Sequence, residues 1–127
     1  MMTESEFLAM SPREQDAAVA EARGWKLAPN DYGELWGVTA GGGRFCVPKF
    51  TEDIATAWEL VEEMQADGFD GYCVAEGEVY FSKGDVHNRA VLSSFGASSP
   101  PVDDWSAATQ ALHISIAYLK AKGVILG

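Results

Sequence analysis

The segment VPKFTEDIATAWELVEEMQADG, from Val47 to Gly68, constrains the fold more than any other part of this chain. Its acidic residues lie on one side of a helical projection, and its apolar residues recur on the other at Ile54, Ala57, Trp58, Val61 and Met64. This periodicity predicts an amphipathic helix packed on a core, with Thr51 as its N-cap and Gly68 just past its end. Because Pro48 lacks an N–H, the strand before it must end near Val47 or lie at a sheet edge.

Two further helices are predicted, one near each end of the chain. Ser11, Pro12 and Glu14 occupy the N-cap, N1 and N3 positions of a capping box, which predicts a helix that runs to about Arg23. Apolar residues also recur at helical spacing over residues 105–122, and Gly123 follows them. The chain is therefore expected to contain three helices.

Alternating apolar runs predict two β-hairpins. Residues 34–39 and 44–47 flank three successive glycines, and residues 69–74 and 79–81 flank the turn-forming pair Glu76-Gly77. Residues 89–95 could add a fifth strand before a loop at residues 96–104. The order of elements predicts one α+β domain over residues 1–127, with a small, mostly antiparallel sheet of four to five strands.

Three segments also resemble a known family. FTEDIATAWELVEEM is similar to the central motif of the phage ABA sandwich domain family, and FLAMSPREQDAAVAEARGWK resembles its opening helix and Gly-Trp-Lys exit. ALHISIAYLKA resembles its alanine-rich last helix. The chain departs from the family pattern at Gln15, Ala18 and His113. The resemblance implies an α-β-α sandwich, with helices on both sides of the sheet, and a phage or prophage origin, with no reaction attached.

Charge and composition restrict the partners. The formal net charge of −10 opposes sequence-independent binding of DNA or RNA, so nucleic acid is not expected as a partner. No run of about twenty apolar residues occurs, and the N-terminus is acidic where a signal peptide would be basic. We therefore expect no membrane association and a location in the cytoplasm of an infected or lysogenic bacterium.

The sequence offers few candidates for catalysis or metal binding. Cys46 and Cys73 lie among alternating apolar residues in predicted strands, where reduced thiols behave as small hydrophobes. His87 and His113 lack partners at the spacing of a triad or a metal site, so His113 is expected at the core or a helix contact. No catalytic residue, metal or cofactor is predicted, and whether the chain is an enzyme stays open, with a non-enzyme favoured.

The favoured hypothesis is a non-catalytic binding protein that sequesters a small molecule, such as a signalling nucleotide, or blocks a host factor in counter-defence. A nucleotide would need cations for its phosphates and an aromatic ring for its base. The candidate contacts are Arg44, Lys49, Lys83, Arg89, Tyr32 and Trp36. The alternatives are a small hydrolase using His87 and a minor virion-associated structural protein. The apolar tail at residues 124–126 could support a homo-oligomer.

Overall fold

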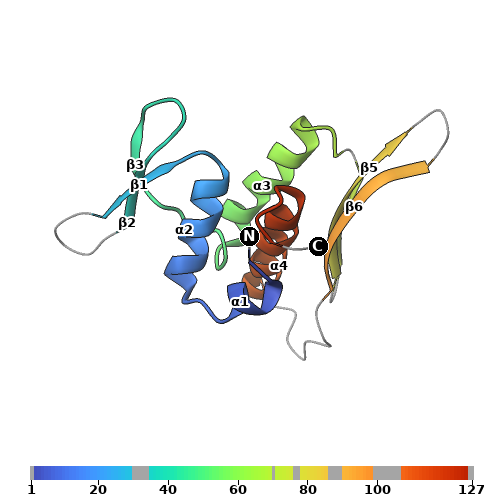
Figure 1. Ribbon diagram of the computed structural model, residues 1–127, viewed down its shortest axis with the longest axis horizontal. Helices are drawn as coiled ribbons and strands as arrows, with labels where there is room; N and C mark the ends of the chain where they lie inside the picture. The colour runs from blue at the N-terminus through green and yellow to red at the C-terminus, as the bar shows by residue number, and fades with distance from the viewer. Residues whose placement is uncertain are drawn as a thin grey trace.

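The computed structural model describes residues 2–29, 35–69, 71–75, 78–85, 90–98 and 107–125. Figure 1 shows the arrangement of these elements. The helices are α1 (Glu4–Leu8), α2 (Pro12–Ala22), α3 (Ile54–Ala66) and α4 (Ala107–Ala121). The strands are β1 (Lys26–Pro29), β2 (Leu35–Val38), β3 (Arg44–Cys46), β4 (Gly71–Ala75), β5 (Glu78–Asp85) and β6 (Ala90–Ser98).

The strands form two separate antiparallel sheets. Sheet 1 has the order β1-β2-β3, and sheet 2 has the order β4-β5-β6. Figure 1 places the helices between them: α2 contacts β1 and β2, α4 contacts β5 and β6, and α3 packs along α4. The α+β class and the antiparallel pairing are confirmed.

The layering differs from the expected α-β-α sandwich. The described residues show a helical centre with a sheet on either side, in place of one sheet of four to five strands covered by helices. Strand β3 stops two residues before Pro48, and the chain then turns into α3. Helix α3 packs along α4, which contacts β5 and β6, so the second hairpin lies on the far side of the helices from sheet 1.

Several boundaries also differ from the sequence expectation. Helix α1 was not predicted, although Thr3 accepts a hydrogen bond from the N–H of Glu6 and begins it with a capping box. Strand β1 was not predicted from the sequence. Strand β6 continues to Ser98, so the loop expected from residue 96 was placed too early.

The two predicted N-caps have different outcomes. Ser11 caps α2 as expected, because its hydroxyl accepts a hydrogen bond from the N–H of Glu14 at 3.3 Å. Helix α3 is capped by Asp53, whose carboxylate accepts from the N–H of Ala55. Thr51 was therefore the wrong choice: it is buried, and its hydroxyl is used elsewhere in the fold.

The core lies among the helices. Among the described residues, its largest fully buried side chains come from the four helices, the segment before α3 and the segment after α4: Tyr118, Phe7, Phe50, Leu60, Met64, Ile114, Ile116, Leu119, Ile125, Val19 and Val61. Trp58 was expected in the buried stripe of α3 but is 37% exposed, and Leu60 is buried in that helix. His113 is buried, as expected.

The C-terminal tail folds back onto its own chain. The N–H of Met2 donates to the carbonyl of Val124 at 3.0 Å, and Met2 forms a parallel bridge with Ile125, which is buried. The expectation that this tail is free to join a neighbouring molecule is therefore corrected for its described residues. Within the described ranges, no helix has the length and apolarity needed to cross a bilayer.

Candidate functional site

Sheet 1 has two faces of different character. Residues directly opposite each other in an antiparallel ladder point to the same face, and successive residues alternate. The register pairs Ala28 with Trp36 and Trp36 with Cys46, and it pairs Lys26 with Val38 and Val38 with Arg44. These residues form what we call the outer face: Lys26, Ala28, Trp36, Val38, Arg44 and Cys46.

The inner face turns toward the helices over part of its width. Leu27, Gly37 and Phe45 lie opposite one another there. A Cβ on Gly37 would come within 2.8 Å of the Trp25 ring, so this glycine allows Trp25 to lie against β2. Trp25 then meets Phe45 at 6.5 Å between ring centroids. Phe45 is nevertheless 55% exposed, because β3 lies beyond the cover of the helices.

Sheet 1 also differs from the whole chain in charge. Its described residues, together with the segment as far as Lys49, carry the cations Lys26, Arg44 and Lys49 and no carboxylate. All three are exposed. Within the described part of the chain, no ion pair involves Arg44. The described strands of sheet 1 are thus locally basic and partly aromatic in a chain of net charge −10, and the exposed carboxylates Glu52 and Asp53 follow only in the turn after Lys49.

The predicted ligand contacts do not all lie together. Trp36 and Arg44 share the outer face of sheet 1, and Lys49 follows β3 by three residues. Lys83 belongs to β5 in sheet 2, on the other side of the helices (Figure 1). Tyr32 and Arg89 lie outside the described residues. His87, the alternative catalytic residue, also lies outside them.

Cys46 is not the buried strand residue that the sequence suggested. Its thiol is free and exposed, on the outer face opposite Trp36. The alternation of apolar residues around it misled the prediction because β3 is an edge strand with all three residues exposed. The side-chain surroundings of Cys73 are not among the described features.

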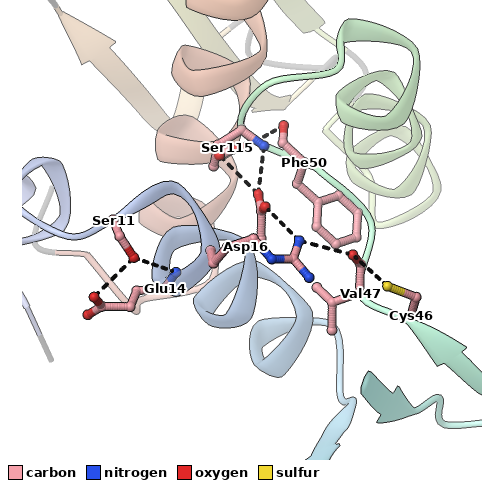
Figure 2. A network of polar contacts seen from close by, with 9 residues as sticks. Ser11, Glu14, Asp16, Cys46, Val47, Phe50 and Ser115 are labelled. Carbon is pink, nitrogen blue, oxygen red and sulfur yellow. Dashed lines mark hydrogen bonds and ion pairs between the residues drawn. The ribbon is translucent and has the colours of Figure 1, made fainter. Parts of the chain in front are cut away.

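A polar network at the helical centre fixes how the chain leaves β3 (Figure 2). Asp16 on α2 is fully buried, and its Oδ1 accepts from the backbone N–H of Thr51 at 3.0 Å and from the Thr51 hydroxyl at 2.9 Å. Arg13 bridges Oδ2 of Asp16 and the carbonyl of Val47. Ser115 on α4 donates to the Phe50 carbonyl. These contacts hold residues 47–51 between α2 and α4.

Burial raises the pKa of Asp16 above its ordinary value of 3.8, although the Thr51 hydrogen bonds and the Arg13 charge lower it. A perturbed carboxylate can mark a catalytic site. Here its oxygens are occupied by Thr51 and Arg13, and the side chain has no exposed surface. The arrangement explains Asp16 as a structural carboxylate, and Cys46 is linked to the network only through a 4.0 Å contact with the Val47 carbonyl.

A second charged cluster joins α2, α3 and α4. Arg23 forms ion pairs with Glu63 at 3.4 Å and Glu59 at 3.6 Å, and it lies 5.6 Å from the centroid of the Phe50 ring. The Tyr118 phenol is buried near Glu63. Its pKa is raised mainly by burial and also by the nearby Glu63 carboxylate. Tyr118 therefore stays neutral at physiological pH. Neither its hydroxyl nor Oε2 of Glu63 has a hydrogen-bond partner within the described structure.

The comparisons with known proteins return no relative. No family model matches this chain, and neither a curated protein nor a solved structure matches it. The family resemblance is thus carried only by the segments quoted above. Within the described residues, no three His, Cys, Asp or Glu side chains gather as a metal site would require. The site must therefore be judged from its own geometry.

Sequence reasoning missed two features of sheet 1. Phe45 was placed in a strand but was not recognised as exposed, and β1 was not recognised as the strand that completes the sheet. One signal was available, because Pro48 indicated that the preceding strand ends early or lies at an edge. Both alternatives hold: β3 ends at Cys46 and is an edge of sheet 1.

Proposed function

We propose that this chain is a non-catalytic binding protein that blocks a bacterial host protein through sheet 1. The observation that carries the proposal is the exposed strand β3, where Phe45 is 55% exposed beside Arg44 on a locally basic sheet. Exposed aromatic and arginine side chains are the residues most enriched at protein interfaces. The polar network at the helical centre, by contrast, is engaged in holding the fold.

The proposal includes a phage or prophage origin and a counter-defence role in the cytoplasm of the infected cell. The resemblance of residues 50–64 to the phage family motif supports the origin. An exposed free thiol at Cys46 fits a reducing compartment, because oxidising compartments favour disulfides. A host protein, and no nucleic acid or membrane, is the partner proposed.

Site-specific crosslinking tests this proposal. Phe45 is replaced by photoreactive p-benzoyl-phenylalanine, and the protein is irradiated in a bacterial extract. The matched control carries the same group in place of Leu8, another exposed apolar residue at 50% exposure, in α1. We expect a discrete protein adduct from position 45 that excess unmodified protein prevents. Absence of this adduct, or equal adducts from both positions, would overturn the proposal.

A second candidate is the sequestration of a small nucleotide. It is favoured by one observation, namely that Trp36 and Arg44 occupy the same outer face, with Arg44 diagonal to Trp36 across the β2–β3 ladder. Such an arrangement can stack a base and contact a phosphate. Calorimetric titration with a cyclic dinucleotide tests it. If combining Arg44→Ala with Lys49→Ala leaves the affinity unchanged, this candidate is rejected.

A further inference from the structure

The free edge of sheet 1 can be located from its hydrogen bonds. The N–H of Thr39 donates to the carbonyl of Gly43 at 2.8 Å, and the N–H of Val47 donates to the carbonyl of Leu35 at 3.0 Å. Hydrogen-bonded pairs alternate along an antiparallel ladder with pairs that make no such bond. The two observed bonds therefore determine the role of every residue of β3 between them.

The alternation makes Phe45 and Gly37 a hydrogen-bonded pair. Arg44 with Val38, and Cys46 with Trp36, are then the pairs that share no backbone hydrogen bond. The N–H and C=O groups of Arg44 and Cys46 consequently point away from β2. Within the described part of the chain, no strand pairs with them on that side. All three residues of β3 are exposed, so this edge offers two donors and two acceptors to an incoming strand.

The side chains beside this edge offer further contacts. Phe45, next to Trp25, would lie along one side of an added strand and could be covered by its apolar residues. Arg44 lies on the outer face, on the opposite side of the sheet from Phe45. Lys26, on β1, lies on the same outer face in the same row of paired residues. An extended segment with apolar and acidic residues in alternation matches this arrangement.

Charge distinguishes between possible occupants. A second copy of β3 would bring the same exposed cations, Arg44 above all, against one another across the new strand pair. An acidic segment would instead meet the cations Lys26, Arg44 and Lys49. Electrostatic complementarity therefore favours an acidic segment of another protein over a second copy of this chain.

We infer that β3 is a docking edge that takes up an extended acidic segment of a partner protein as a fourth strand of sheet 1. This inference rests on the proposed function and specifies how the partner is held. Backbone hydrogen bonds to Arg44 and Cys46 provide the pairing, Phe45 provides apolar contact, and the three cations select for acidic side chains. The short edge limits the bound segment to a few residues.

The test uses short synthetic peptides and the intact protein. A peptide of alternating glutamate and valine is compared with its lysine-valine counterpart by fluorescence anisotropy. A third version of the acidic peptide carries N-methyl groups at every central residue and so lacks the donors that strand addition needs. We expect the acidic peptide to bind at least roughly tenfold more tightly than either of the other two. Equal binding of the acidic and lysine peptides, or of the acidic and N-methylated peptides, overturns the inference.

Variants of the protein test the same edge with the acidic peptide unchanged. Arg44→Glu should weaken binding of the acidic peptide by roughly tenfold or more. The matched control Lys83→Glu makes the same change in net charge on sheet 2 and should leave binding within about twofold, apart from long-range charge effects that salt screens. Equal losses from the two variants would show a general charge effect and overturn docking at β3.

Cys46→Pro removes one outward N–H and keeps the pairing toward β2, because proline is tolerated where the N–H faces solvent. We expect it to abolish binding. Circular dichroism shows whether this variant folds; if it does not, the N-methylated peptide decides the same point on the unmodified protein. If crosslinking at position 45 captures a host protein while N-methylation of the peptide does not weaken its binding, the proposed function is supported and strand addition is rejected.

Discussion

Arg13 and Arg44 illustrate how the helical centre and sheet 1 use similar side chains differently. The Arg13 guanidinium bridges Asp16 and the carbonyl of Val47, so its charge serves the fold. Arg44 is exposed on sheet 1 and forms no ion pair with a described residue. The place of a cation in the fold, more than its presence in the sequence, therefore distinguishes a structural role from a binding role.

The comparison predicts that substitutions in the two regions affect different measurements. Changes at the helical centre should lower the free energy of unfolding. Changes on sheet 1 should weaken binding and leave the free energy of unfolding nearly unchanged. The following variants are ordered by their expected effect on stability.

The largest effect is expected from Asp16→Ala. It leaves the buried N–H and hydroxyl of Thr51 without their acceptor, which should lower the free energy of unfolding by about 3 kcal/mol. Asp16→Asn keeps an acceptor for Thr51 and should cost about 1 kcal/mol. Urea unfolding measures both. Losses of equal size would contradict the role assigned to the Thr51 hydrogen bonds.

Arg23→Gln should have the next largest effect. This side chain is 22% exposed and holds Glu59, Glu63 and the face of Phe50 together, so its loss should cost about 1 kcal/mol. Lys122→Gln is the matched control. Lys122 pairs with Asp67 and lies over the Tyr118 ring, but it is more exposed, and we expect a loss below about 0.5 kcal/mol. Thermal unfolding under identical conditions would contradict this account if the control lost more stability than Arg23→Gln.

The buried carboxylate also predicts a pH dependence. Because burial raises the pKa of Asp16 in the folded state, the folded protein binds the Asp16 proton more tightly than the unfolded chain does. The stabilisation from this group is complete below the ordinary pKa of 3.8 and is lost as the pH rises through the folded value. The stability of the unmodified protein relative to Asp16→Asn should therefore increase as the pH falls from neutral toward 3.8. A difference that stays constant or decreases would contradict the raised pKa.

The smallest effect on stability is expected for Phe45→Ser. Since Phe45 is 55% exposed, the variant should change the free energy of unfolding by less than about 0.5 kcal/mol. It should nevertheless abolish the contact that the proposed partner makes with this ring. Urea unfolding and the peptide anisotropy assay, run on the same preparation, separate the two effects. A large loss of stability with unchanged peptide affinity would show that Phe45 stabilises the fold and does not contact the peptide.

Local signals predicted much of the secondary structure. The N-cap at Ser11, the hairpin around three glycines and the second hairpin each depend on residues close in sequence, and the structure contains all three. The capping box is only half formed, because Glu14 accepts a hydrogen bond from the Ser11 hydroxyl where the motif uses the Ser11 backbone N–H. The early end of the strand before Pro48 was also correct. Local patterns did not determine where the hairpins lie, so the division into two sheets was not predicted.

The same distinction applies to the candidate site. The shared face of Trp36 and Arg44 follows from the register of one hairpin and was within reach of the sequence. Lys83 could not be separated from them, because its distance depends on how the second hairpin packs across the helices. The contact of Asp16 with Thr51 joins positions 35 residues apart, which no helical periodicity indicates.

Docking of an acidic strand at the edge of sheet 1 can be measured by residue-resolved amide hydrogen exchange with and without the glutamate-valine peptide. We expect slower exchange at the N–H groups of Arg44 and Cys46, which point outward, and little change at Phe45, which is already paired with Gly37. Unchanged exchange at Arg44 and Cys46 under saturating peptide, or protection confined to sheet 2, would contradict it.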